Sequence, residues 1–453
     1  MLEEQTSASP LSGEPSSMGS ESSPAAGRSL PPPGTHLPGL DGLRGVAILL
    51  VLAFHLLPSQ PVTSHVTAWI YRAAWSGWCG VDLFFVLSGF LITGILLDAK
   101  GLPHYFRNFY ARRTLRIFPL YYGVLVVIFV IVPLFLRPPS PAFEHLQANQ
   151  IWLWCYASNV CTVWANGWVF LAGNWHLNHF WSLAVEEQFY LVWPLVVLLL
   201  SRRRLLAACA LCVVAAPLLR WAFLANGYGF VVAYTFTPCR VDALAVGAAV
   251  AVAARAPGGL SALRRFAPAV ALALGAALLG LFVWRHGLRI ADEVMQTAGY
   301  SLLALFFAAA LVLVVAAPAG GLLGRCAALP ALRFFGKYSY GLYVYHGLFL
   351  MPFLSVRTET LAGWLGSSFL AVVVQFAAVV GISLGASLLS WHLYEKQFLK
   401  LKRYFEARPA AAAGSALPAA NRLPRPALAP APGTAPPGGG AGGYDEAFMR
   451  AKE

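Results

Sequence analysis

Arg44 and His55 lie in the first apolar stretch of the chain, where a cation and an imidazole are both costly. They are eleven positions apart, so in a helix they share one face and lie about 16 Å apart along the axis. That distance is about half of the roughly 30 Å hydrocarbon thickness of a bilayer. A cation near one membrane surface and a titratable ring deeper inside favour a ligand that lies along this helix face.

Other apolar stretches also carry polar side chains, and a charge within a membrane helix costs about 2.5–3.5 kcal/mol, so it needs a reason. Counting from the nearest basic loop residues at 1.5 Å per residue places Ser88, Asp242 and Glu186 about 18, 20 and 24 Å from the inner surface. His55 falls in the same zone. The arginines of residues 107–116 gather instead at the inner surface. This layout suits transfer of an activated group from a cytoplasmic carrier to an outward acceptor.

The elements that must position these groups are membrane helices. The chain is 58% hydrophobic and 11% charged, whereas soluble domains carry about 25% charged residues. The pattern predicts an all-α, polytopic integral membrane protein. We expect about ten transmembrane helices, over residues 42–58, 78–98, 117–136, 180–200, 205–224, 236–254, 266–284, 296–317, 338–356 and 367–393.

The loops predict the orientation. With both termini cytoplasmic, the inward connections hold most of the loop lysines and arginines, as the positive-inside rule requires. The net charge of +13 then reflects these loops, and no nucleic-acid partner is expected. Residues 1–37 and 406–453 are predicted to be disordered extensions around a membrane domain at 38–405. The cysteines have no metal-ligand spacing, and whether Cys155 and Cys161 are bonded stays open.

The residue types indicate acid–base chemistry. A histidine such as His55 can deprotonate a hydroxyl, and a carboxylate such as Glu186 can orient the ring or handle its proton. Arginines bind phosphates through forked, charge-assisted hydrogen bonds. Structural interpretations stay open beside these. They are a snorkelling anchor for Arg44, hydrogen bonding between helices for His55, a packed polar side chain for His346, an ion pair of Arg240 with Asp242, a cap or ion pair for Asp82, and solvent exposure for Glu187.

Six stretches resemble the integral-membrane acyltransferase 3 family, and they occur in the right order over about residues 38–400. The matching stretches are residues 40–45 (LDGLRG), 84–90 (FFVLSGF), 112–119 (RRTLRIFP), 181–190 (WSLAVEEQFY), 240–242 (RVD) and 339–346 (SYGLYVYH). The family includes acyltransferases that act on O-antigen, peptidoglycan, nodulation factors and macrolides.

The resemblance implies an acyl-CoA donor, usually acetyl-CoA, and a hydroxyl acceptor on an extracytoplasmic or membrane-associated glycan. It places the family's arginine–histidine motif on Arg44 and His55, its arginine pair on Arg113 and Arg116, and its glutamate on Glu186. We predict catalytic roles for His55, Glu186 and Arg44, and donor binding by Arg44, Arg113, Arg116 and Ser88. Ser88 or Tyr343 would donate to the developing oxyanion. Further candidates are Asp41, Glu187, Arg240, Asp242, Tyr343 and His346, and no metal is expected.

Several alternatives remain open. His55 would act as a base or carry the acyl group itself. The donor would be succinyl-CoA or a longer acyl-CoA, and the acceptor a small molecule such as a macrolide. Outside the enzyme class, a secondary transporter or a non-catalytic scaffold would also bury charges. Larger family members add an extracytoplasmic hydrolase-like domain, so here we expect acylation by the membrane domain itself or by a separate partner. We expect the protein to lie in the bacterial inner membrane. The sequence leaves the oligomeric state open.

Overall fold

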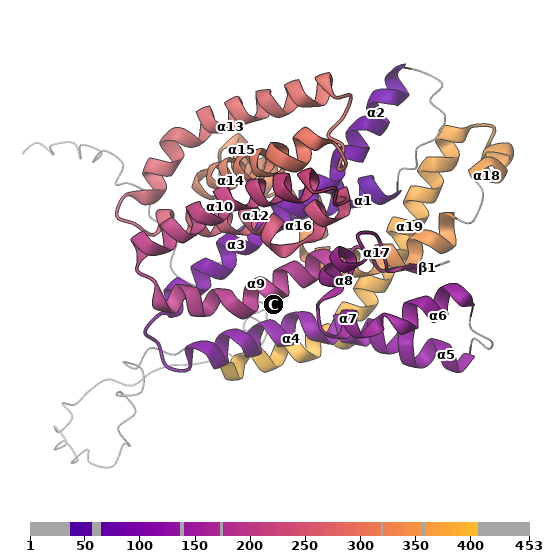
Figure 1. Ribbon diagram of the computed structural model, residues 1–453, viewed down its shortest axis with the longest axis horizontal. Helices are drawn as coiled ribbons and strands as arrows, with labels where there is room; N and C mark the ends of the chain where they lie inside the picture. The colour runs from indigo at the N-terminus through magenta and orange to yellow at the C-terminus, as the bar shows by residue number, and fades with distance from the viewer. Residues whose placement is uncertain are drawn as a thin grey trace, which may run out of the picture. The chain divides into compact units, whose positions relative to one another are not determined.

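The computed structural model describes residues 37–56, 65–135, 140–172, 175–318, 320–354 and 358–405. Among these residues the fold is helical apart from one two-stranded antiparallel hairpin (Figure 1), so the predicted helical class is confirmed. The two extensions predicted to be disordered lie, apart from Leu37, outside the described residues.

The α-helices and strands have the following bounds. They are α1 (Pro38–Leu56), α2 (His65–Trp75), α3 (Gly80–Ala99), α4 (Tyr105–Val126), α5 (Val132–Phe135), α6 (Pro141–Ala148), α7 (Gln150–Trp154), α8 (Ser158–Trp164), β1 (Leu171–Ala172), β2 (Trp175–His176), α9 (Phe180–Leu199), α10 (Arg202–Ala225), α11 (Phe230–Thr235), α12 (Thr237–Ala254), α13 (Gly259–Trp284), α14 (Tyr300–Ala316), α15 (Leu322–Ala327), α16 (Pro330–Lys337), α17 (Ser339–Leu354), α18 (Thr358–Leu365), α19 (Ser368–Ser390) and α20 (Lys396–Lys400). Tighter or wider turns join several of them, as η1 (Ser76–Cys79), η2 (Val127–Ile131), η3 (Met295–Gly299), η4 (Trp391–Glu395) and η5 (Leu401–Phe405).

Nine segments within the described residues are long and apolar enough to cross a membrane. They are Pro38–His55, His65–Ala99, Tyr105–Phe135, Phe180–Leu199, Arg202–Ala225, Phe230–Ala254, Gly259–Trp284, Met295–Ala316 and Ser368–Phe405. The tenth expected span corresponds to α17, which is a helix of 16 residues and is not among the nine. The count of ten is therefore not confirmed, and the cytoplasmic placement of the termini stays a prediction.

Helix α3 lies at the centre of the packing, because most of its residues are buried. It packs against α12, α1, α9 and α14. Glycines let α3 and α12 come very close. A Cβ added at Gly247 would lie 2.0 Å from the Val86 carbonyl oxygen, and one added at Gly89 would lie 1.9 Å from that of Leu244. The two backbones are thus in direct contact, which fixes the position of the residues on α3.

A second close contact joins α1 to α16, and it explains the glycines of the 40–45 stretch. A Cβ added at Gly45 would lie 2.0 Å from the carbonyl oxygen of Leu332. This seam holds α1 against α16, while α17 packs against both α1 and α19. The helix that carries Arg44 and His55 is therefore held from several sides.

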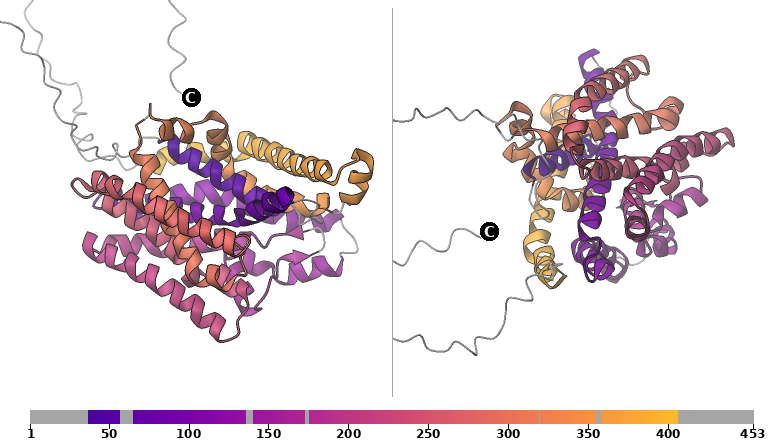
Figure 2. Two further views of the ribbon diagram at one scale, coloured as in Figure 1. Left: turned by 90° about the horizontal axis from the view of Figure 1, so that it is seen from above. Right: turned by 90° about the vertical axis from the view of Figure 1, so that its left-hand side faces the viewer.

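The outer helices complete the bundle. Helix α13 lies at the edge and packs on α14 (Figure 1). Its exposed side chains include Leu272 and Leu279, and apolar side chains at such a surface suit contact with lipid. Helix α4 runs beside the C-terminal turns α20 and η5, and α18 lies at one end of α19 (Figures 1 and 2).

Two regions expected to be loops are folded. Residues 65–75 form α2, and the connection before α9 contains α6, α7, α8 and the hairpin, in which Leu171 pairs with His176. Cys155 and Cys161 are both free thiols. The sequence-based account missed these elements because they are short, and periodicity is a weak signal over so few residues.

Candidate active site

A cavity of about 130 Å³ lies between α1, α3, α4, α9 and α17. It brings together six residues that the sequence singled out as candidates. These are Arg44, Ser88, Arg113, Arg116, Glu186 and Tyr343. They come from five different helices, so no single stretch of sequence contains the site.

Three arginines give the cavity its charge. Arg44 is about a third exposed and has Asp41 on the same helix 3.7 Å away. The guanidinium of Arg113 lies over the ring of Tyr190, and that of Arg116 lies over the ring of Trp391. Within the described part of the chain, neither Arg113 nor Arg116 forms an ion pair with a carboxylate. Gathering three cations without full compensation is unfavourable, and an anionic ligand would relieve it.

Hydroxyl groups and one carboxylate line the rest of the cavity. Glu186 lies beside Ser88 and Tyr190, and the Ser88 Oγ is 2.5 Å from the Tyr190 hydroxyl. The Tyr343 hydroxyl donates to the carbonyl oxygen of His179 at 2.8 Å. That proton is already committed. The Ser88 hydroxyl has Tyr190 and the Glu186 carboxylate as neighbours, so it has to turn away from them to donate to a bound carbonyl.

His55 is not among the residues that line the cavity. It lies instead in a cluster of four imidazoles. Its ring centroid is 4.9 Å from that of His346 and 5.9 Å from that of His176. The His179 ring is 4.8 Å from His346 and 5.8 Å from His176. We call these four residues the histidine cluster.

Tyr343 connects the cluster to the cavity. It lines the cavity, and its ring lies 5.5 Å from His179 and 5.6 Å from His346. The cavity and the cluster are thus neighbouring sites with one shared wall. No contact between Glu186 and His55 occurs in the described part of the chain, so a direct carboxylate–imidazole pair, as the sequence suggested, is absent there.

The tautomer of His55 follows from its hydrogen bond. Its Nδ1 is 3.0 Å from the carbonyl oxygen of Val51. A carbonyl can only accept, so Nδ1 carries the proton and Nε2 keeps a lone pair. Nε2 is therefore the nitrogen that can take a proton or attack an acyl group.

His176 and His179 are not among the candidate site residues predicted from the sequence. His176 lies in the hairpin, and His179 directly precedes α9. Their signal was modest but present, because two histidines three positions apart come just before the span that carries Glu186. Glu187 follows Glu186 but does not line the cavity, and its Oε1 is buried without a hydrogen-bond partner.

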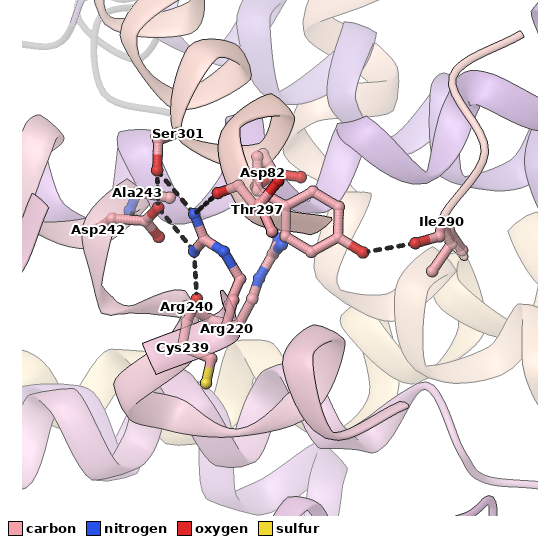
Figure 3. A network of polar contacts seen from close by, with 10 residues as sticks. Asp82, Arg220, Cys239, Arg240, Asp242, Ala243, Ile290, Thr297 and Ser301 are labelled. Atoms are coloured by element: carbon pink, nitrogen blue, oxygen red, sulfur yellow. Dashed lines mark hydrogen bonds and ion pairs between the residues drawn. The ribbon is translucent and has the colours of Figure 1, made fainter. Parts of the chain in front are cut away.

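Arg240 and Asp242 lie outside both sites, in a buried network that Figure 3 shows. The sequence left open an ion pair between these two residues, but the pairing is crossed. Arg240 Nη2 is 2.6 Å from Asp82 Oδ1, and Arg220 Nη1 is 2.9 Å from Asp242 Oδ2. Arg220 is fully buried in α10. These pairs tie α12 to α3 and α10.

The apolar spans and the polar cavity among them define an integral membrane protein with an arginine-lined cavity. The chain belongs to the acyltransferase 3 family, because residues 37–392 match the family model described as an acyltransferase domain. The protein is accordingly an enzyme that transfers acyl groups.

Three curated relatives that match part of the chain are named as O-acetyltransferases. The peptidoglycan O-acetyltransferase OatA of Listeria monocytogenes is 37% identical over 163 residues, which are 35% of this chain and 24% of the relative. The putative peptidoglycan O-acetyltransferase YrhL of Bacillus subtilis is 34% identical over 226 residues, 48% of this chain and 33% of the relative. The O-acetyltransferase OatA of Staphylococcus aureus is 33% identical over 186 residues, 37% of this chain and 26% of the relative.

The matched segments thus span about a quarter to a third of the length of these curated relatives. No solved structure matches the chain.

Proposed function

We propose that the protein is an O-acetyltransferase of the bacterial inner membrane. It moves acetyl from cytoplasmic acetyl-CoA to a hydroxyl of an extracytoplasmic or membrane-associated glycan. The names of the relatives support acetyl transfer to a glycan. The observation that carries the proposal is the arginine-lined cavity that meets the histidine cluster at Tyr343.

The donor is held by its phosphates. Arg44, Arg113 and Arg116 supply fixed positive charge on one cavity, and forked guanidinium groups suit phosphate oxygens. Glu186 lines the same cavity and limits the repulsion among the three cations. Ser88 donates a hydrogen bond to the thioester carbonyl oxygen as negative charge develops there.

In the transfer step, His55 Nε2 takes the proton of the acceptor hydroxyl. The hydroxyl oxygen attacks the thioester carbon, so a C–O bond forms and the C–S bond breaks. The CoA thiolate leaves and receives a proton from the imidazolium of His55. In a two-step version, His55 Nε2 first takes the acetyl group as the CoA thiolate leaves. The acceptor hydroxyl then attacks the acetyl carbon, the C–N bond to the ring breaks, and the hydroxyl proton passes to the CoA thiolate. Both versions need the lone pair that the Val51 contact leaves on Nε2.

The test uses the full chain in lipid nanodiscs with labelled acetyl-CoA and a pentamer of N-acetylglucosamine as the acceptor probe. We expect the pentamer to gain one acetyl mass, and His55→Ala to lower that rate by about 100-fold or more. His145→Ala is the matched control, because His145 is exposed on α6. Unchanged transfer by a folded His55→Ala variant contradicts the mechanism. A parallel assay with succinyl-CoA tests the alternative donor.

A further inference from the structure

The histidine cluster contains more imidazoles than the transfer step uses. Its members come from α1, from the stretch that joins the hairpin to α9, and from α17, so three distant parts of the chain converge there. His346 is fully buried, and His179 is 2% exposed. Burying polar rings is costly unless their nitrogens find partners, so the partners of each nitrogen are informative.

One ring nitrogen of His346 and one of His179 each have a backbone carbonyl as hydrogen-bond partner. His346 Nδ1 lies 2.7 Å from the carbonyl oxygen of Tyr343, and His179 Nε2 lies 3.4 Å from that of Val344. Carbonyls only accept, so these nitrogens carry the ring protons. The remaining nitrogens, His346 Nε2 and His179 Nδ1, are buried without a hydrogen-bond partner, and so is Nδ1 of His176.

His346 Nε2 and His179 Nδ1 are therefore hydrogen-bond acceptors. Burial lowers the pKa of His176 to about 4, so this ring is uncharged at neutral pH. Among the described residues, no three histidine, cysteine, aspartate or glutamate side chains are arranged to hold a metal ion. Two buried nitrogens that offer lone pairs suit hydroxyl groups and do not favour carboxylates or phosphates, which have no proton to give.

We propose that the histidine cluster is the subsite for the acceptor, and that it recognises neighbouring hydroxyls of a sugar ring. This inference rests on the proposed transferase function. His346 Nε2 and His179 Nδ1 accept hydrogen bonds from hydroxyls next to the one that His55 deprotonates. His346 and His179 are positioning residues in this scheme, and Tyr343 lies where the acceptor subsite meets the donor cavity.

The surrounding hydrogen bonds hold these acceptors in place before the sugar arrives. The backbone of Tyr343 fixes His346, while the side chain of Tyr343 fixes the backbone of His179. Ser182 contacts the same tyrosine hydroxyl at 2.5 Å. Two helices, α9 and α17, are thereby braced at the point where the sugar would bind, which reduces the ordering cost of binding.

The test separates acceptor binding from donor chemistry. We compare wild type, His346→Leu and His346→Gln, and use His145→Gln as the matched control on an exposed helix. Three quantities are measured in nanodiscs: hydrolysis of acetyl-CoA without acceptor, the KM for the N-acetylglucosamine pentamer in transfer, and pentamer binding by calorimetry. Monodisperse elution and thermal unfolding check that each variant is folded.

We expect His346→Leu to raise the pentamer KM and Kd about tenfold, as for one lost hydrogen bond to a buried acceptor. Acetyl-CoA hydrolysis and the KM for acetyl-CoA stay unchanged. His346→Gln restores part of the affinity, because its amide oxygen can accept a hydroxyl proton. If His346→Leu does not fold, His176→Leu in the hairpin provides the same comparison.

Two results overturn the inference. Unchanged pentamer affinity in the folded variants means that the cluster is a structural site filled by water. An equal loss of hydrolysis and transfer means that His346 serves the donor chemistry. Failure of the proposed function is distinguishable, since wild type itself would then neither hydrolyse acetyl-CoA nor acetylate the pentamer.

Discussion

Replacing Asp82 by Asn removes the negative partner of Arg240 while keeping the size of the side chain. The two side chains are 1% and 0% exposed, and their closest atoms are 2.6 Å apart. The variant leaves a buried guanidinium whose Nε and Nη1 already lack partners. Among the described residues, the compensation that remains is the charge of Asp242, which is already paired with Arg220, and the Tyr300 ring, whose centroid is 4.4 Å from the Arg240 guanidinium.

The expected cost follows from burial. Breaking a buried ion pair by removing one partner costs about 3–5 kcal/mol, and a desolvated cation–π contact is worth about 2 kcal/mol, which is already present in wild type. We therefore expect Asp82→Asn to lower the free energy of unfolding by about 3–5 kcal/mol, and the apparent Tm by about 5 °C or more. The double variant Asp82→Leu with Arg240→Met recovers most of this loss, because no unpaired charge is left.

An exposed ion pair supplies the matched control. Arg255 and Asp98 are 2.7 Å apart, but their side chains are 21% and 27% exposed. Breaking such a pair costs about 0–1 kcal/mol, so Asp98→Asn changes the Tm little. The assay is thermal unfolding in nanodiscs, followed by tryptophan fluorescence. Equal Tm changes for the two asparagine variants refute the reasoning. Loss of acetyl transfer by Asp82→Asn at an unchanged Tm instead places the network in the mechanism.

Two further perturbations test the cavity and the packing. Arg113→Ala is expected to raise the KM for acetyl-CoA about tenfold or more, because one charge-assisted contact is lost. Arg107→Ala is the control, because Arg107 is exposed on the same helix. Equal KM values for the two variants contradict phosphate binding by Arg113. Gly247→Ala is expected to destabilise the fold by more than about 1–3 kcal/mol, because its Cβ meets the Val86 backbone. Gly280→Ala on α13 has open space and is expected to be neutral or slightly stabilising in the same thermal unfolding measurement, so matching losses would disprove the close contact.

The sequence predicted the helical membrane class and singled out six of the residues that line the cavity, but it did not predict which polar side chains pair with one another. Depth along a helix can be counted from flanking arginines, so Ser88, Glu186 and Asp242 were placed in one zone. Depth says nothing about the direction in which a helix face points. Asp242 therefore lies in a different network from Glu186, paired with Arg220.

The histidine cluster escaped prediction for a related reason. Two of its members, His176 and His179, lie outside the regular apolar periods on which the spans were predicted. Solvation is the default expectation for a histidine at a span edge, and only tertiary packing brings these rings beside His346. The short helices α6, α7 and α8 in the connection before α9 were not predicted either.

Helix α1, which packs closely against α16, has a consequence for which acyl donor could bind along it. Arg44 and His55 belong to the same uninterrupted helix, so their separation of about 16 Å along the axis is as rigid as the helix itself. On the proposed function, a donor that contacts both residues needs a long arm between its anionic group and its acyl carbon. Acetyl phosphate, whose charge adjoins the acyl group, would be too short. The proposed enzyme would thus select its carrier by length, whereas the cavity walls would limit the size of the acyl group.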